Sequence, residues 1–97
     1  MRLKAVLDYA AAQPKWFVYA ITDQAGKPVY VGSTKHPERR HRQYLERKGR
    51  WQKAIREWVA GNRHVFELLD HYPTRRMMLD AEHEYIAYLS PRFNIAR

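Results

Sequence analysis

The sequence contains no cysteine among its 97 residues. This excludes disulfide bridges, cysteine zinc sites and a thiol nucleophile. It also lacks a long hydrophobic run, since the longest apolar stretches, residues 16–21 and 65–69, are far too short to span a bilayer. The N-terminus carries Asp8 early and has no apolar stretch typical of a signal peptide. We therefore expect no membrane partner and a bacterial or phage cytoplasm as the location.

Acidic residues are scarce relative to basic ones. The chain has 10 Asp and Glu residues and 18 Lys and Arg residues, which gives a formal net charge of +8 and a pI near 10.0. A surplus of this sign predicts a polyanionic partner, most often nucleic acid. A ribosome-associated protein or a merely basic surface is the alternative, and charge alone does not separate these. Seven Tyr, three Trp and three Phe predict a thin, aromatic-rich core.

Hydrophobic periodicity and turn residues predict an α+β fold in the order α-β-β-α-α-β-α. Strands are expected at residues 17–22, 28–32 and 65–69, and helices at 2–12, 37–48, 51–61 and 75–89. The first two strands form a hairpin around the turn sequence of residues 23–26, within a three-stranded sheet flanked by helices. Gly49 is expected to end the second helix, and Thr74 to cap the start of the last one. The apolar stripe of the third helix comprises Trp51, Ala54, Ile55, Trp58 and Val59.

Tyr19 and Tyr30 stand out on the predicted hairpin. If Thr22 and Lys27 close a four-residue loop, Tyr19 lies directly opposite Tyr30 on one face of the sheet. Gly32 then follows on that face, and its missing side chain would leave room for a ligand. A cross-strand aromatic pair that fills the core is the alternative interpretation.

Glu82 lies within the apolar stripe of the last helix. The stripe is formed by Met78, Leu79, Tyr85, Ile86 and Leu89. A buried carboxylate costs several kcal/mol (about 3–5) unless a cation or hydrogen bonds compensate it. A metal ion or an arginine partner would account for Glu82 in this place. The alternative is a boundary residue whose carboxylate reaches water.

A basic cluster lies at the start of the second predicted helix. It comprises Lys35, His36, Arg39, Arg40, His41 and Arg42. Helix N-termini attract anions through their free amides, so this cluster predicts a phosphate-binding surface. The nearby aromatic residues Tyr44 and Trp51 favour nucleic acid over a solvated basic face, which is the usual alternative for a charge run.

Taken together, these residues resemble the GIY-YIG endonuclease family. The two name-giving motifs match Phe17-Val18-Tyr19 and Tyr30-Val31-Gly32, and the passage into the following helix continues to Arg40. Downstream, Glu82 and the segment from Pro91 to Asn94 are similar to the family's metal-binding glutamate and C-terminal Asn element. The resemblance covers about residues 16–96. It implies one nuclease domain over residues 1–97, with residues 1–14 as an N-terminal helical extension.

Two positions depart from the family pattern. Phe17 replaces the first glycine, and Tyr44 stands where homing and restriction members often carry a histidine. A histidine base at that position is therefore excluded here, and His41, the nearest substitute, faces a different side of the helix.

The resemblance implies a metal-dependent DNA endonuclease that is structure-selective or weakly sequence-specific. It implies Tyr19, Tyr30, Arg40 and Glu82 as catalytic residues. Glu82 would hold Mg²⁺ or Mn²⁺, Arg40 would bind a phosphate oxygen, and Tyr19 would orient or deprotonate the water. Asn94 would tether the C-terminal tail to the wall of the site. The residues expected to contact nucleic acid are Gly32, Lys35, His36, Arg39, Arg42 and Tyr44.

The substrate and partners are less determined than the chemistry. Single-stranded, branched and duplex DNA are all compatible with the sequence as substrates, and so is RNA. A homodimer or a separate specificity partner would supply the recognition that a minimal domain lacks. The alternative function is a non-catalytic DNA-binding or RNA-binding module with the same fold. Binding alone gives no reason to place Glu82 on the apolar stripe, so the sequence favours the enzyme.

Overall fold

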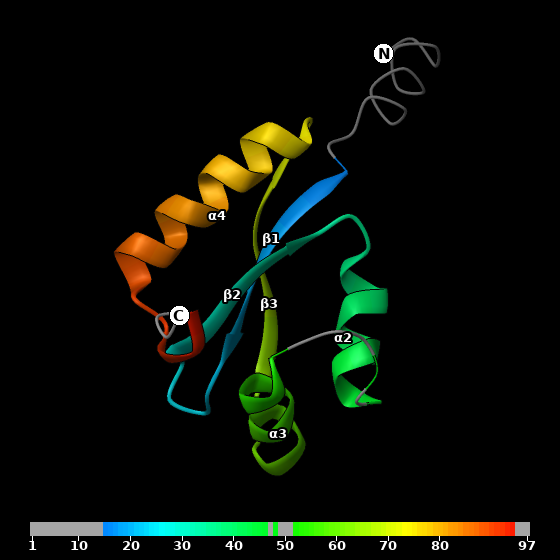
Figure 1. The fold of residues 1–97 in the computed structure, drawn as a ribbon, viewed down its shortest axis with the longest axis vertical. Coiled ribbons are helices and arrows are strands. Elements are labelled where there is room, and N and C mark those ends of the chain that lie inside the picture. The colour runs from blue at the N-terminus through cyan, green and yellow to red at the C-terminus, as the bar shows by residue number, and fades with distance from the viewer. Residues whose placement is uncertain (1–14, 47, 49–51, 95–97) are drawn as a thin grey trace, which may run out of the picture.

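The computed structural model describes residues 15–46, 48 and 52–94. The helix predicted at residues 2–12, the stop at Gly49 and the side chain of Trp51 lie outside these residues. Three antiparallel strands form one sheet with β1 at its centre, in the order β2-β1-β3 (Figure 1). Helices pack around it, which confirms the predicted α+β fold. None of the described helices is long and apolar enough to cross a membrane.

The elements follow the predicted order along the described chain. They are β1 (Trp16–Thr22), β2 (Pro28–Thr34), α2 (Pro37–Leu45), α3 (Lys53–Gly61), β3 (Val65–Tyr72), α4 (Arg75–Leu89) and the short 3₁₀ helix η1 (Arg92–Asn94). The prediction for α4 is confirmed at both ends. The hydroxyl of Thr74 accepts a hydrogen bond from the N–H of Met77 at 3.2 Å, and Ser90 adopts a left-handed conformation (φ 47°) just before Pro91.

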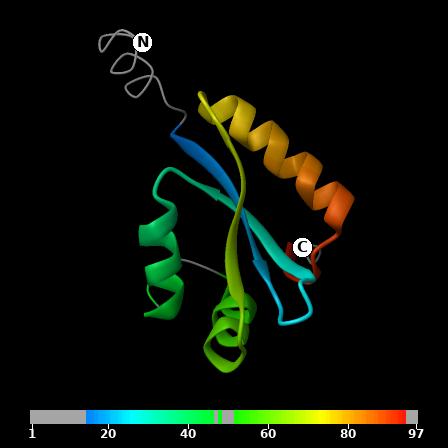
Figure 2. The same cartoon turned by 180° about the vertical axis from the view of Figure 1, so that it is seen from behind.

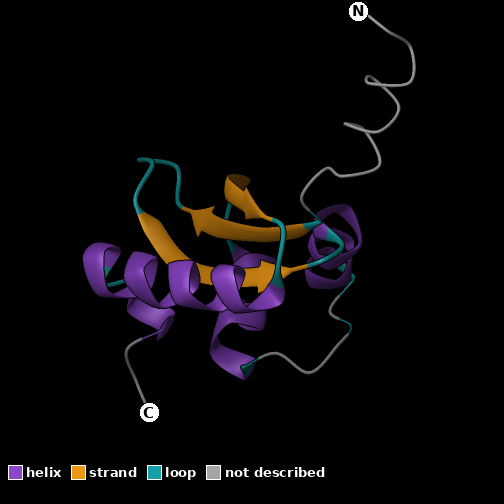
Figure 3. Ribbon diagram, turned by 90° about the horizontal axis from the view of Figure 1, so that it is seen from above, coloured by secondary structure: helices purple, strands orange, loops and turns teal. Residues whose placement is uncertain are grey.

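The two faces of the sheet carry two separate cores. Successive side chains of a strand point to opposite faces, so Tyr19 and Ile21 of β1 face α2 and α3 while Val18 and Ala20 face α4 (Figures 1 and 2). The first core comprises Tyr19, Ile21, Val29, Tyr44, Ile55 and Val59. The second comprises Val18, Ala20, Val31, Met78 and Ala81. Leu79, Tyr85, Ile86 and Leu89 pack against this second core, which confirms the apolar stripe predicted for α4. The strands between these layers are twisted (Figure 3).

The predicted hairpin register is wrong. Tyr19 pairs with Gly32, and Tyr30 pairs with Ile21. The strands end at Thr22 and resume at Pro28, so the loop contains five residues instead of four. The carboxylate of Asp23 holds this longer loop by accepting hydrogen bonds from the N–H groups of Ala25 and Lys27, both at 2.9 Å. The register also shifts between Ile21 and Thr22.

Several predicted boundaries need correction. Helix α2 ends at Leu45, three residues early, because Tyr44 is its last buried side chain and the N–H of Lys48 turns back to the carbonyl of Gln43 at 2.8 Å. In α3, Ala54 is exposed, and the core contacts come from Ile55 and Val59 with half-buried Trp58. Strands β2 and β3 extend beyond the predicted ends, to Thr34 and Tyr72, because β2 pairs with β1 from Phe17 onward and β3 pairs with all of β1.

Candidate active site

Tyr19 lies at the centre of the predicted site. Its side chain is fully buried on the face of the sheet covered by α2 and α3. The Tyr19 and Tyr44 hydroxyls lie 3.0 Å apart in a buried hydrogen bond. The guanidinium of Arg40 donates from Nη1 to the Tyr19 hydroxyl at 3.2 Å. Strand β1 and helix α2 are therefore joined through the hydroxyl group of Tyr19.

The Tyr19 side chain occupies the space beside Gly32. A Cβ atom built on Gly32 would lie 2.6 Å from Cζ of Tyr19 and closer still to its hydroxyl oxygen. The two residues pair across β1 and β2, so they face the same side of the sheet. The missing side chain of Gly32 thus makes room for Tyr19, whereas the sequence predicted room for a ligand.

Burial sets the ionisation of this tyrosine pair. It raises the pKa of Tyr19 to about 12, with Tyr30 adding to the rise, while the hydrogen bond from Tyr44 and the charge of Arg40 oppose it. Burial also raises the pKa of Tyr44, and Tyr19 adds to that rise. Both phenols therefore keep their protons near neutral pH. A neutral Tyr19 is a poor base for a water molecule and a good hydrogen-bonding partner for Arg40.

Arg40 is held in place by two oxygen atoms. Its Nη1 donates to the carbonyl of Ser33, at the end of β2, at 3.2 Å, in addition to the Tyr19 hydroxyl. The side chain is half-buried and lines a hollow of about 150 Å³ together with four other residues. These are Thr34, His36, Arg39 and Gln43. A planar, permanently charged guanidinium fixed in this way is suited to a phosphate group.

The basic cluster surrounds this hollow where β2 passes into α2. The hydroxyl of Thr34 accepts a hydrogen bond from the N–H of His36 at 3.1 Å, and Pro37 begins the helix. Lys35 is exposed, and its Nζ lies 4.8 Å from the ring centre of half-buried Trp16. The exposed side chains of Arg39 and Arg42 extend the positive surface along α2.

Tyr30 completes a cluster of three tyrosines. Its ring centre lies 6.4 Å from that of Tyr19 and 6.5 Å from that of Tyr44. Unlike the other two, Tyr30 is only half-buried. The structure therefore brings together Tyr19, Tyr30, Arg40 and Tyr44, although Tyr19 and Tyr30 do not pair directly across the hairpin.

Glu82 lies on the face of the sheet opposite to that of Tyr19 and Arg40. It lies on α4, whose buried residues Met78 and Ala81 pack against the second core, whereas Arg40 contacts Tyr19 in the first. Glu82 is half-buried, which agrees with the boundary interpretation of its position. It takes part in none of the ion pairs within the described part of the chain. A ligand shared by Glu82 and Arg40 would therefore have to reach both faces of the sheet, which has β2 and β3 as its edge strands.

Asn94 fastens the C-terminal tail to the β2 edge. Its side-chain Oδ1 accepts a hydrogen bond from the N–H of Val31, and its Nδ2 donates to the carbonyl of Val31, both at 2.8 Å. The amide thus satisfies both outward-facing backbone groups of Val31, as a neighbouring strand would. Phe93 of the same tail packs against the first core beside Trp58. The tail therefore crosses the β2 edge from the face of α4 to the face of α3.

Phe66 was not singled out by the sequence. Its ring stacks on Tyr19, with centres 4.5 Å apart and planes 20° apart, and on His41, with centres 4.7 Å apart and planes 15° apart. The His64 ring lies at a right angle to that of His41, with ring centres 5.6 Å apart. Burial lowers the pKa of His41, and His64 adds to this. No local signal in the sequence links β3 to the tyrosines, because strand order is a tertiary property.

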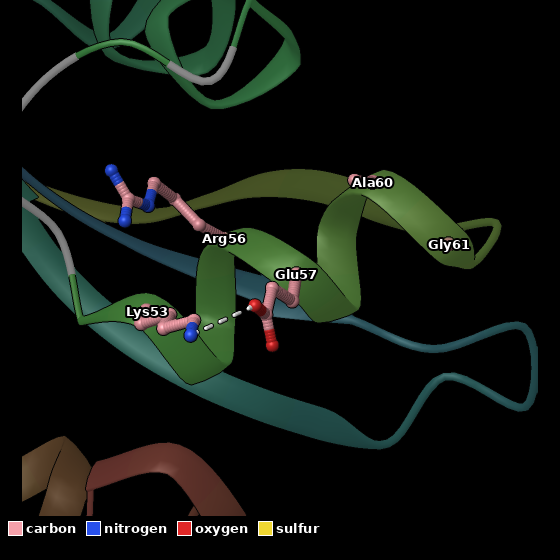
Figure 4. A pocket seen from close by; sticks show the side chains of 5 residues that line it. All are labelled: Lys53, Arg56, Glu57, Ala60 and Gly61. Atoms are coloured by element: carbon pink, nitrogen blue, oxygen red, sulfur yellow. Dashed lines mark ion pairs between the residues drawn. The ribbon is translucent and has the colours of Figure 1, made fainter.

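A second hollow, of about 420 Å³, lies on α3 and is lined by Lys53, Arg56, Glu57, Ala60 and Gly61 (Figure 4). An ion pair joins Nζ of Lys53 to Oε1 of Glu57 at 3.7 Å across it. Arg56 points away from this pair in the same view. None of the predicted site residues lines this hollow, so the candidate site stays at the β2–α2 junction.

Comparisons with known proteins identify a family and a matching fold. The family model of the GIY-YIG catalytic domain matches residues 15–94. A search of curated proteins found no match. Among solved structures, the GIY-YIG N-terminal endonuclease domain of UvrC from Thermotoga maritima is similar. A tyrosine-to-phenylalanine variant bound to its catalytic divalent cation has 20% identity and a TM-score of 0.64, over 99% of this chain and 100% of that chain. The magnesium-bound form has 20% identity and a TM-score of 0.58, over 98% and 100%.

Proposed function

Because the chain belongs to the GIY-YIG family, we propose that it is a metal-dependent endonuclease that hydrolyses phosphodiester bonds in DNA. The observation that carries the proposal is the placement of Arg40. Its guanidinium is fixed by the Tyr19 hydroxyl and the Ser33 carbonyl at the wall of a basic hollow. A donor fixed in advance stabilises developing negative charge without reorganising during the reaction.

The roles of the tyrosines follow from their burial. Tyr19 is fully buried, and its pKa is raised to about 12, so it would position Arg40 and would not remove a proton from water. Tyr30 is the partly exposed member of the cluster, and it is the tyrosine that would reach the phosphate or the attacking water. Tyr44 would hold the hydroxyl of Tyr19.

Glu82 would hold the divalent cation. Within the described residues no group of three or more His, Cys, Asp or Glu side chains could enclose a metal ion, so a fully protein-ligated site is not available there. A single half-exposed carboxylate fits Mg²⁺, which keeps several of its own waters, and Mn²⁺ takes similar oxygen ligands. When bound, such a cation would neutralise charge on the phosphate and lower the pKa of a coordinated water. Arg40 would hold a non-bridging phosphate oxygen.

A non-catalytic nucleic-acid-binding module is the second candidate. The net charge of +8 and the exposed Lys35, Arg39 and Arg42 would suffice for binding DNA or RNA through phosphates. The hydrogen bonds that fix Arg40 at Tyr19 and Ser33 favour catalysis, because an exposed basic surface needs no such support for binding.

The test is cleavage by the wild type and Glu82→Ala on single-stranded, duplex, nicked and branched DNA, with structured RNA alongside. Each substrate is tested with Mg²⁺, with Mn²⁺ and with EDTA. We expect cutting that requires the metal and is lost in Glu82→Ala, while Glu84→Ala, an exposed carboxylate on the same helix, cuts normally. A folded wild type that binds DNA and cuts none of these substrates would favour the binding module. A fully active Glu82→Ala would remove Glu82 from the mechanism.

A further inference from the structure

Phe66 packs between Tyr19, at the proposed site, and His41 of helix α2. It belongs to β3, on the other side of β1 from Gly32, and pairs with Ile21. Its ring is half-buried and stacks on Tyr19 and on His41 at centre distances of 4.5 and 4.7 Å. Three rings from β1, β3 and α2 are therefore packed nearly parallel to one another.

This stack restricts Tyr19, a side chain that positions Arg40. The Tyr19 ring lies over Gly32, where a Cβ atom would clash, and it is also stacked on Phe66. Its hydroxyl then meets Tyr44 at 3.0 Å and Nη1 of Arg40 at 3.2 Å. A tyrosine ring that can neither tilt nor slide keeps its hydroxyl at a fixed point, so the direction of the guanidinium depends on Phe66 as well.

We propose that Phe66 is a positioning residue for phosphodiester cleavage, acting through the Tyr19 ring on Arg40. This inference rests on the proposed nuclease function. Phe66 would contact neither the phosphate nor the metal. Its contribution would be to the orientation of Arg40, so its loss would lower the cleavage rate and leave DNA affinity unchanged, because affinity comes mainly from the exposed basic residues.

The experiment compares Phe66→Leu, Phe66→Tyr and Val59→Ala with the wild type. Leucine keeps the apolar volume and removes the flat ring, whereas tyrosine keeps the ring. Val59→Ala is the control, because Val59 is buried in the same core on α3 and makes no ring contact with Tyr19. Each protein is measured for thermal unfolding, DNA affinity, single-turnover cleavage and the ¹³Cζ NMR shift of Tyr19, which reports the position of the phenol ring.

In Phe66→Leu we expect single-turnover cleavage to fall by about tenfold or more at unchanged DNA affinity, together with a moved Tyr19 resonance. Phe66→Tyr should restore both properties, and Val59→Ala should lose stability while cleaving like the wild type. Equal cleavage by Phe66→Leu and Val59→Ala would overturn the proposal and leave Phe66 as a core residue. Absence of cleavage by the folded wild type would overturn the proposed function and with it this role of Phe66. That would hold even if the Tyr19 resonance moved in Phe66→Leu as expected.

Discussion

Replacing Gly32 with alanine tests how tightly the site is packed. The added Cβ would lie 2.6 Å from Cζ of Tyr19, where ordinary contacts begin at 3.4 Å, so the ring must retreat by about 0.8 Å or more. Tyr19 has little room for this because Phe66 is stacked on it at 4.5 Å. A shift of that size would stretch the hydrogen bonds of 3.0 Å to Tyr44 and 3.2 Å to Arg40 beyond a useful length.

The expected cost combines two effects. Overpacking a core costs about 1–3 kcal/mol, and each lost buried hydrogen bond costs about 0.5–1.5 kcal/mol. With both hydrogen bonds lost, we therefore expect Gly32→Ala to lose about 2–6 kcal/mol of unfolding free energy. For a chain of this size, such a loss lowers the Tm by roughly 10 °C or more. Cleavage should fall in parallel, because Arg40 loses the Tyr19 hydroxyl as an acceptor that orients it.

Thermal unfolding followed by circular dichroism measures this effect. The matched control is Gly61→Ala at the end of α3, where a new Cβ would meet no atom within 4 Å. That variant should keep its stability or gain up to about 1 kcal/mol, since alanine favours a helix. If Gly32→Ala unfolds at the wild-type temperature and cleaves normally, the packing of Tyr19 over Gly32 does not constrain the site.

Three further predictions concern the tail, the central tyrosine and a helix end. Asn94→Ala removes both hydrogen bonds to Val31 and should cost about 1–3 kcal/mol in urea unfolding, and wild-type stability would refute the tether. The pKa of Tyr19 is raised to about 12 from an ordinary value near 10, so its stabilising contribution is present below about pH 10 and is lost as the pH rises towards 12. Over that range wild-type stability should fall by about 2–3 kcal/mol more than that of Tyr19→Phe, and parallel curves would contradict the effect of burial. Thr74→Ala removes the cap of α4 and should cost about 1 kcal/mol, whereas Thr74→Ser should not.

Local signals in the sequence were sufficient for the elements whose ends are set by neighbouring residues. Helix α4 has a capping threonine before it and a left-handed serine and a proline after it, and its bounds agree with the prediction. The spacing of Met78, Tyr85 and Ile86 also identified the helix face that packs on the sheet.

The features that were missed depend on contacts that a single sequence does not contain. The hairpin register depends on the side chain of Asp23, which stabilises a five-residue loop where four residues were expected. The role of Gly32 became clear only from the Tyr19 ring lying over it. Phe66 lies in a strand with no conspicuous motif, and its stacking on Tyr19 follows from the strand order β2-β1-β3.

The most direct test of the account is single-turnover cleavage by Arg40→Lys. Lysine keeps the positive charge but lacks the planar guanidinium. In the wild type this group donates hydrogen bonds to the Tyr19 hydroxyl and the Ser33 carbonyl, and it would still have donors left for a phosphate. We expect the folded variant to bind DNA with nearly wild-type affinity and to cleave it slower by about 100-fold or more. Wild-type cleavage by Arg40→Lys would contradict the account, because a loosely placed charge would then do what we attribute to a fixed guanidinium.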